Sequence, residues 1–271
     1  MTHPLALHQL CLMDVAPVEL PGIAREAGLS RVSVFVTPPS ADLDVFPLVK
    51  AGRESKEFVA ACRTHDVQVH NIDCFSIGPE TDFADFEQAL DVGAEIGARR
   101  LTALVQDPDP GRAAARMAQF AELAQAHGIA VSIEFMKFSK LQSIEAGALL
   151  VTKSGHNNLS LLVDVLHLIR TGGNIADLKA TDSRLIGAAQ ICDGPLDVPE
   201  GGFGEALHNR GIPGEGEFPL PAFLAALPAD CPVDIEAPLK RLADKGVSPL
   251  ERAQRLVRAT NVLLAEGFDG G

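Results

Sequence analysis

Two kinds of hydrophobic pattern alternate along the chain. Short runs rich in apolar and β-branched residues predict strands, and stretches whose apolar residues recur every three or four positions predict amphipathic helices. The expected strands are Leu5–Leu12, Arg31–Val36, Val67–Phe75, Arg100–Val105, Ala130–Phe135, Leu159–Val165, Leu185–Cys192 and Val233–Glu236. The expected helices are Val18–Ala27, Glu54–His65, Phe83–Ile96, Arg112–Ala126, Leu141–Lys153, Ile175–Ala180, Pro221–Leu227 and Pro249–Ala265.

The ends of these segments and their number indicate the fold. His127-Gly128 ends a helix just before a strand, and Ser248-Pro249 begins the last helix with a capping residue followed by proline. Eight strand–helix units in 271 residues fit a (β/α)8 TIM barrel, whose typical length is about 250 residues. A doubly wound open sheet is the competing α/β fold, but no Gly-x-Gly-x-x-Gly follows the first strand to favour its dinucleotide-binding form. No linker divides the chain, so we expect a single barrel domain over residues 1–271.

Four consecutive expected strands end in a polar residue where an apolar one would be usual. These residues are Glu134, Asp164, Gln190 and Glu236. In a barrel, the ends of consecutive strands are neighbours on the face that carries active sites. Three crowded carboxylates need a counter-charge, and three anionic oxygens with one amide suit Mn²⁺ or Mg²⁺, with Co²⁺ as a further candidate. The pattern therefore predicts one divalent metal ion held by these four residues; the alternative is that each acid caps a helix or pairs with a Lys or Arg.

The balance of charge narrows the choice of partners. Asp and Glu number 36 against 23 Lys and Arg, a net charge of −13, which disfavours nucleic acids and anionic membranes as partners. No apolar run reaches the ~18 residues of a membrane helix, and no basic segment precedes the first apolar stretch. Five widely spaced cysteines fit a reduced protein, so we expect a cytoplasmic location. We expect a small-molecule substrate, and the helices of such barrels often pair, which is compatible with a homo-oligomer.

Several short motifs follow the expected strands of the C-terminal half. They are Glu134, Asp164-Val165-Leu166-His167, Gln190-Ile191-Cys192-Asp193, Arg210-Gly211-Ile212-Pro213-Gly214-Glu215-Gly216 and Ile235-Glu236. In these motifs the chain resembles the xylose isomerase-like TIM-barrel superfamily, also called the sugar phosphate isomerase/epimerase family. The resemblance implies a divalent metal held by Glu134, Asp164, Gln190 and Glu236. Many members have His at the third ligand position, and Gln190 is instead similar to hydroxypyruvate isomerase and to the dehydratases that act on inosose and dehydroshikimate.

Three further residues of this half are candidates for contact with the substrate. We expect His167 to hydrogen-bond the substrate or transfer a proton, the alternative being a helix cap or the partner of an acid. Arg210 is expected to bind a substrate carboxylate or phosphate, the alternative being a salt bridge to Glu215 or Glu217. His208 is a weaker substrate-binding candidate, because histidines on loops are mostly solvated.

Other polar residues also lie at or near the ends of the expected strands. His70 and Asp73 end the third expected strand on opposite faces, so at most one points inward. We expect His70 to be the substrate-binding residue, since members of the family often carry a His on this strand. Asp193 is expected to cap a helix or loop, and Asp234 is expected deep in the barrel, where it needs a partner that the sequence does not identify.

These residues predict an enzyme that works through an enolate. The metal would polarise a carbonyl group, and Glu134 and Glu236 would remove and return a proton. The first hypothesis is an isomerase or epimerase of a small hydroxy-carbonyl, sugar-like substrate. The alternative is a dehydratase of a cyclic polyol ketone such as dehydroshikimate or inosose. Two other classes are weaker: a nuclease of the endonuclease IV type, which needs three zinc ions and many His ligands, and a non-catalytic barrel that serves as a partner subunit.

Overall fold

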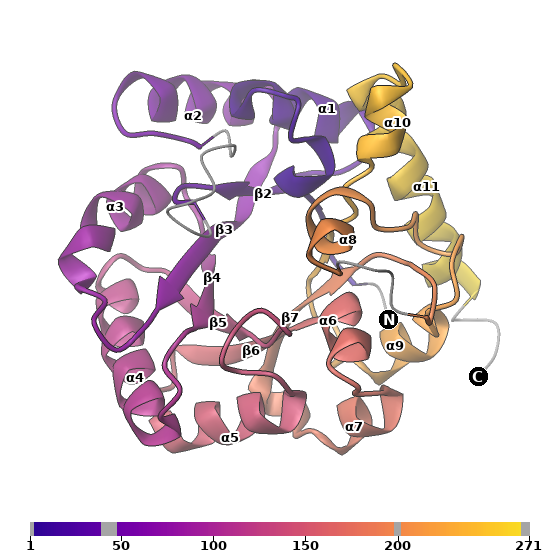
Figure 1. Ribbon diagram of the computed structural model, residues 1–271. Coiled ribbons are helices and arrows are strands. Elements are labelled where there is room, and N and C mark those ends of the chain that lie inside the picture. Colours follow the sequence, from indigo (N-terminus) through magenta and orange to yellow (C-terminus); the bar gives the residue numbers. More distant parts are fainter. Residues whose placement is uncertain (1–2, 39–47, 198–201, 267–271) are drawn as a thin grey trace.

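The computed structural model describes residues 3–38, 48–197 and 202–266. In this part of the chain the strands follow one another around a closed barrel, each parallel to its neighbours, and the last pairs with the first (Figure 1). The strands are β1 Leu5–His8, β2 Arg31–Phe35, β3 Gln68–Ile77, β4 Arg100–Val105, β5 Ala130–Glu134, β6 Leu159–Asp164, β7 Ile186–Ile191 and β8 Val233–Ile235. The prediction of a (β/α)8 TIM barrel is confirmed.

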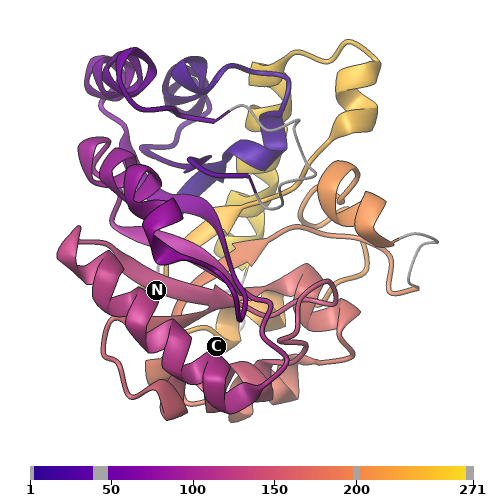
Figure 2. The same cartoon turned by 60° about the vertical axis from the view of Figure 1, so that its left-hand side comes forward.

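Helices form the outer layer of the barrel (Figure 2). The α-helices are α1 Leu20–Glu26, α2 Arg53–His65, α3 Glu87–Glu95, α4 Pro110–Ala126, α5 Ile144–Ser154, α6 Val165–Arg170, α7 Ile175–Ala180, α8 Gly202–His208, α9 Leu220–Ala226, α10 Lys240–Asp244 and α11 Pro249–Glu266. Short 3-10 helices are η1 Gln9–Leu12, η2 Pro17–Glu19, η3 Phe83–Phe86 and η4 Ser183–Leu185. The apolar faces of strands and helices meet closely: a side chain at Gly93 of α3 would collide with Ile72 of β3. The core therefore lies between the two layers, as in other barrels.

The inside of the barrel is polar near the N-terminal ends of the strands. Arg100 donates to Ser132 at 2.7 Å, and Ser132 lies 3.0 Å from Ser160. Ser33 donates to Asp234 at 2.9 Å, which gives Asp234 a buried partner. These contacts hold polar side chains where apolar side chains usually fill a barrel.

Several elements differ from the prediction, among them the helices α8 and α10, which were not expected. β1 ends at His8, because the His8 ring accepts the backbone N–H of Leu10 and caps η1, so the chain leaves the strand four residues early. β3 continues to Ile77, two residues beyond the predicted end. Helix α6 was not expected; it begins directly after β6, where Asp164 accepts the backbone N–H of Leu166.

Two general properties of the described residues bear on the chemistry. All five cysteines are buried and free of disulfide bonds. None of the helices in the described ranges combines the length and the apolar character that passage through a bilayer requires.

Candidate metal centre and active-site cavity

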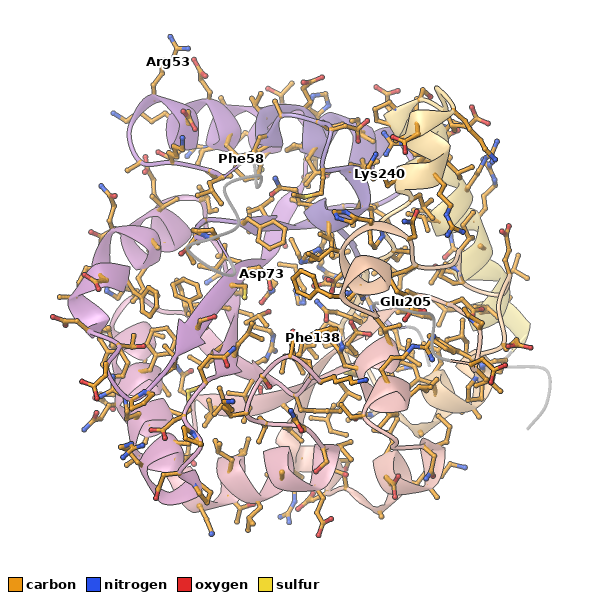
Figure 3. The ribbon with its side chains drawn as sticks, viewed as in Figure 1. Arg53, Phe58, Asp73, Phe138, Glu205 and Lys240 are labelled. Atoms are coloured by element: carbon orange, nitrogen blue, oxygen red, sulfur yellow. The ribbon has the colours of Figure 1, made fainter. Side chains whose placement is uncertain are left out.

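A cavity of about 470 Å³ opens at the carboxyl ends of the strands. Its floor is polar, with Asp73, Glu134, Gln190, Arg210 and Glu236 among the lining side chains. Its walls are apolar and include Leu10, Phe35, Leu104, Met136 and Leu207. Figure 3 shows Asp73 and Phe138 near the middle of the ring of strands. This is the end of the barrel at which enzymes of this fold carry their active sites.

Three of the four expected metal ligands, Glu134, Gln190 and Glu236, line this cavity, and the fourth, Asp164, is buried and bonded to Arg210, which also lines it. Glu134 is the last residue of β5 and Asp164 the last of β6, while Gln190 lies opposite Asp164 on β7 and Glu236 directly follows β8. All four side chains are buried. Gln190 Oε1 and Glu236 Oε2 have no hydrogen-bond partner within the described residues. Buried acceptors are rarely left unpaired, so these two oxygens fit a site that takes a bound ion.

A smaller set of atoms already has metal-binding spacing. One ligand atom each from Glu134, Asp164 and His167 lies within 4.8 Å of the others. His167 was expected to contact the substrate, and this spacing makes its ring a candidate metal ligand as well. Carboxylate oxygens and an imidazole nitrogen suit Mn²⁺, Zn²⁺ and similar divalent ions.

Arg210 lies among these carboxylates. Its terminal nitrogens donate to Asp164 at 2.7 Å and to Glu236 at 3.1 Å, and its Nε donates to the carbonyl of Ala206 at 2.9 Å. The expected alternative, a salt bridge to Glu215 or Glu217, is not what the structure shows. Burial lowers the pKa of Arg210, but Glu236 and Asp164 more than offset this and raise it well above its usual value. Arg210 therefore stays charged and orients two of the four expected ligands.

The floor carries more negative than positive charge. Asp73, Glu134, Asp164 and Glu236 supply four carboxyl groups, against the one guanidinium of Arg210. Burial, with the carboxylates of Glu236 and Asp164, raises the pKa of Glu134 well above its usual range. Burial also raises the pKa of Glu236 to about 7, although Arg210 and His8 act in the opposite direction. A divalent cation would remove the excess charge and let both carboxyl groups ionise.

His167 is held in its neutral form. Burial lowers its pKa to about 4, against the opposing effect of Asp164. Its Nε2 lies 3.8 Å from Glu134 and 3.9 Å from Asp164, while its Nδ1 has no partner within the described residues. A neutral imidazole at this point can donate or accept a hydrogen bond at the floor of the cavity.

His8 and Asp73 form a pair that the sequence did not reveal as part of the site. His8 Nε2 donates to Asp73 Oδ2 at 2.9 Å, and Asn71 donates to the same oxygen at 2.8 Å. The carboxylates of Glu236 and Asp73 raise the pKa of His8 against the opposing effect of burial, while Nδ1 accepts the N–H of Leu10 and carries no proton in this arrangement. The sequence signal was weak, because His8 lies inside a run that predicts a strand up to Leu12.

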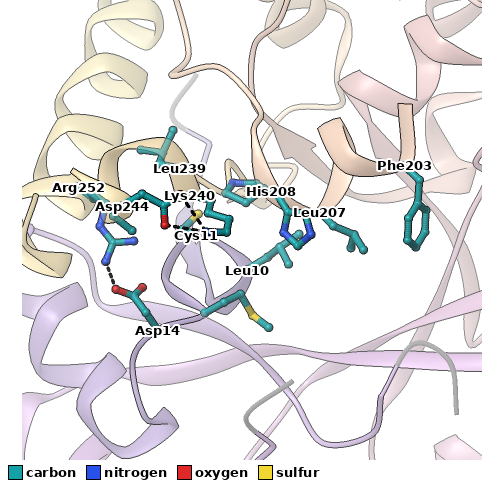
Figure 4. Close-up of a pocket in the computed structure, with 13 residues that line it drawn as sticks. Leu10, Cys11, Asp14, Phe203, Leu207, His208, Leu239, Lys240, Asp244 and Arg252 are labelled. Atoms are coloured by element: carbon teal, nitrogen blue, oxygen red, sulfur yellow. Dashed lines mark hydrogen bonds and ion pairs between the residues drawn. The ribbon is translucent and has the colours of Figure 1, made fainter. Parts of the chain in front are cut away.

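Two expected substrate-binding residues lie outside this cavity. The structure puts Asp73 in the cavity and His70 elsewhere, which corrects the choice between them. β3 extends to Ile77, so His70 lies near the N-terminal end of the strand, within the electrostatic influence of Asp234 and Arg100. The other is His208, which lines a neighbouring cavity between η1, α8 and α10 (Figure 4).

The loop between α8 and α9, which begins at Arg210, folds around Asp193. The Asp193 carboxylate accepts the backbone N–H groups of Gly194, Gly214 and Phe218 at 2.8–3.0 Å, as expected for a loop cap. A side chain at Gly216 would collide with this carboxylate. The glycines of the motif therefore let the loop fold tightly around Asp193, and this loop begins at Arg210.

Comparisons with known proteins agree with this architecture. A family model described as xylose isomerase-like TIM barrel matches residues 22–259. A search of curated proteins finds no match. Among solved structures, a fusion protein of a xylose isomerase-like TIM barrel and a 4-hydroxyphenylpyruvate dioxygenase is 17% identical, with a TM-score of 0.82 over 98% of this chain. The chain spans 43% of that protein's length.

Two other solved structures match over nearly their full length. One is described as the IOLI protein with a binding zinc atom: it is 17% identical, has a TM-score of 0.79, and the match covers 98% of this chain and 99% of that one. The other is described as the "probable 3-DHS dehydratase AsbF" of Bacillus anthracis: it is 12% identical, has a TM-score of 0.71, and the match covers 96% of this chain and 99% of that one. At these identities the likeness establishes a shared fold.

Proposed function

The chain belongs to the xylose isomerase-like TIM barrel family, and from this premise we propose a metal-dependent enzyme. Its reaction is the transfer of a proton on the carbon beside the carbonyl group of a small hydroxy-carbonyl compound. Isomerisation or epimerisation is the outcome that two carboxylates in one cavity, Glu134 and Glu236, support best. Most members of this superfamily are enzymes of these or related types.

One observation carries this proposal. Four polar side chains converge from consecutive strand ends, and two of their buried oxygens, on Gln190 and Glu236, have no partner among the described residues. An isolated polar residue at a strand end is commonly a cap, as Asp193 is. Four together, with an excess of carboxylate, are the donor set of a cation site.

Different residues of the chain have different roles in the proposed reaction. When bound, a divalent cation would polarise the carbonyl group and stabilise negative charge on its oxygen. Glu134 and Glu236 come from β5 and from the end of β8, so they approach the floor from different sides. One removes the proton and the other returns it. His167, kept neutral by burial, hydrogen-bonds the reacting hydroxyl or carbonyl.

Dehydration is the second candidate. Gln190 stands where many relatives have His, a feature that resembles hydroxypyruvate isomerase as well as dehydratases of the family and is therefore compatible with both outcomes. A solved structure with the same fold is described as a dehydratase of 3-DHS. Isomerisation and dehydration share the first step, removal of the proton beside the carbonyl group. In dehydration a β-hydroxyl is then lost, whereas in isomerisation the proton is returned.

A paired measurement tests the proposal. The metal content of the purified protein is determined, and proton exchange in D₂O is followed with small α-hydroxy ketones, inosose and dehydroshikimate. Bound divalent metal with deuterium entering a ketone supports the isomerase or epimerase. A conjugated product that absorbs in the ultraviolet moves the assignment to dehydratase. Failure to bind any divalent metal, even after its addition, overturns the proposal.

A further inference from the structure

The neighbouring cavity shares part of its wall with the active-site cavity (Figure 4). It has a volume of about 390 Å³, and Leu10, Phe203 and Leu207 line both spaces. A single layer of side chains therefore lies between them. Both volumes fall within the range of small-molecule sites, about 300–1,000 Å³. A molecule held in the active-site cavity thus has the neighbouring cavity within reach of a substituent.

The neighbouring cavity also lies next to Glu236 of the candidate metal site. Cys11, which lines it, donates its thiol hydrogen to the carbonyl of Ile235 at 3.1 Å and accepts the N–H of Ala237 at 3.2 Å. These two backbone groups belong to the residues before and after Glu236. The cavity is therefore close to the end of a substrate that the proposed metal would hold.

Segments added to the regular strand–helix units build this cavity. η1 follows β1, α8 follows β7 and α10 follows β8, and each contributes lining residues. The backbone N–H of Arg210 donates to the carbonyl of Pro238 at 3.2 Å, which ties the segment after β8 to the end of α8. Because the segments that follow the strands vary between TIM barrels and determine what each one binds, a cavity built from three of them is suited to substrate selection.

The charged side chains of the neighbouring cavity form ion pairs. Lys240 lies 2.6 Å from Asp244, and Arg252 lies 2.5 Å from Asp14, at the end opposite Phe203 in Figure 4. The Nε of Arg252 has no partner within the described residues, but it is shielded from solvent. Each pair is neutral, so a charged substituent would lose its hydration here without meeting a net opposite charge.

The end that adjoins the active-site cavity is apolar. Phe203 is 45% exposed although it lies at the boundary of the two cavities, and exposed large apolar side chains often mark a binding site. An apolar cavity of about 150 Å³ is sufficient to bind benzene, so the present volume has room for an aromatic ring and a short chain. The other apolar lining residues include Leu10, Met13, Leu207, Pro238 and Leu239.

We propose that the neighbouring cavity binds an uncharged, apolar substituent of the substrate, of the size of an aromatic ring with a short chain. The hydroxy-carbonyl end of the same molecule lies in the active-site cavity, towards Glu134 and Glu236. The inference rests on the proposed function, because it extends the substrate of that reaction. A small sugar-like ketone without such a substituent would leave these apolar walls in contact with water.

Two hydroxamates that bind to the Mn²⁺-loaded protein test the inference. Acetohydroxamate carries only the metal-chelating group, and 6-phenylhexanohydroxamate adds a chain and a ring. The readout is displacement of water from bound Mn²⁺, measured by proton relaxation. We expect the phenylhexyl compound to bind at least about tenfold more tightly, a difference of about 1.4 kcal/mol. Equal affinities overturn the inference, whereas a protein that binds no Mn²⁺ contradicts the proposed function instead.

A variant that fills the neighbouring cavity shows where the ring binds. Ala243 on α10 lines this cavity and not the active-site cavity. We expect Ala243→Phe to reduce the advantage of the phenylhexyl compound to less than about threefold, without changing the affinity for Mn²⁺ or acetohydroxamate. Arg241→Phe adds the same ring to an exposed position of α10 outside the lining and is the matched control, with the full advantage retained. An unchanged advantage in folded Ala243→Phe overturns the inference.

A cysteine at the same position gives a second test if Ala243→Phe does not fold. All five native cysteines are buried, so the new thiol of Ala243→Cys is expected to react first with an aromatic disulfide reagent. We expect 6-phenylhexanohydroxamate to slow this reaction at least about fivefold and acetohydroxamate to leave it unchanged. Equal rates with the two compounds overturn the inference. A thiol that is protected by raised protein concentration alone also overturns it, because a second copy of the chain then covers the cavity.

Discussion

The two halves of the barrel mouth differ in what their strands end with. Strands β5 to β8 carry Glu134, Asp164, Gln190 and Glu236 at or within one residue of their carboxyl ends, and Arg210 bridges two of the carboxylates. Strands β1 to β4 give the cavity His8, Phe35, Asp73 and Leu104, of which the two polar groups pair with each other. Strands β5 to β8, here called the charged half, carry the groups that could hold a cation. Strands β1 to β4, the other half, mainly determine the shape of the cavity. We therefore expect substitutions in the charged half to change turnover, stability or metal content, and substitutions in the other half to change KM.

The largest effect is expected when the charged half loses a carboxylate. Glu236→Gln and Glu134→Gln each remove a proton acceptor of the proposed reaction, so we expect turnover to fall about 10²–10⁴-fold with the fold retained. Turnover, metal content and circular dichroism are measured together. Glu145→Gln, on the exposed face of α5, is the matched control and is expected to behave as wild type. Full activity in both site variants would contradict the assignment of the site.

Substitution of Arg210 is expected to act mainly on the free energy of unfolding. Arg210→Met leaves Asp164 and Glu236 buried without their shared cation, and breaking a buried pair on one side costs about 3–5 kcal/mol. Because a divalent cation can replace the lost charge, we expect Mn²⁺ to stabilise this variant more than it stabilises wild type. Urea unfolding with and without Mn²⁺ measures the difference. An equal gain in both proteins would show that the ion binds away from these carboxylates.

The acidity of Glu236 predicts a pH dependence in metal-free protein. Its pKa rises from 4.5 to about 7 on folding, mainly through burial. The folded state therefore keeps a proton that the unfolded state loses, so this stabilisation is present below pH 4.5 and disappears as the pH rises through 7. Relative to Glu236→Gln, wild type should lose about 3 kcal/mol of unfolding free energy across this window. Parallel pH curves for the two proteins, measured in a chelator, would contradict this.

His167 lies at the centre of the charged half and should act on turnover. Its neutral ring faces Glu134 and Asp164 at nearly 4 Å, beyond direct hydrogen-bond distance. We expect His167→Ala to lower turnover by about 10²-fold and to change metal occupancy much less. Equal losses of turnover and metal would instead assign the ring to the metal or to the structure.

The smallest effect is expected in the other half. Asp73 Oδ2 is fixed by His8 and Asn71, and the side chain lines the cavity. Asp73→Asn should raise KM about tenfold, as expected for one lost hydrogen bond to a charged group, while Mn²⁺ affinity stays the same. A change confined to metal affinity would remove the distinction between the halves.

The hydrophobic pattern along the sequence was sufficient to predict the barrel and the polar residues at the ends of β5 to β8. The strands β5 to β8 are short and apolar, so a polar residue at each end was conspicuous, and parallel strands in consecutive order must bring such ends together. The roles of these residues stay predictions. Gln190 and Glu236 were found by position alone, without knowledge of their surroundings.

The other half could not be predicted because it depends on irregular backbone. The register of β3 shifts against both β2 and β4, so the simple alternation of faces does not hold along this strand, and the choice of His70 over Asp73 rested on the family resemblance alone. The position of His8 in the cavity could not be predicted, because the apolar run that indicates a strand continues after it, although the chain turns into η1 there. Arg210 pairs with residues 46 and 26 positions away, and no local signal distinguishes them from Glu215 or Glu217.

The bridge made by Arg210 also bears on how the chain folds. Small domains that rely on a structural ion are unfolded until they acquire it. Here the chain's own guanidinium already links Asp164 to Glu236. Folding of this chain therefore does not require the proposed ion to compensate these two carboxylates, and binding of that ion is expected to be a separate, reversible step.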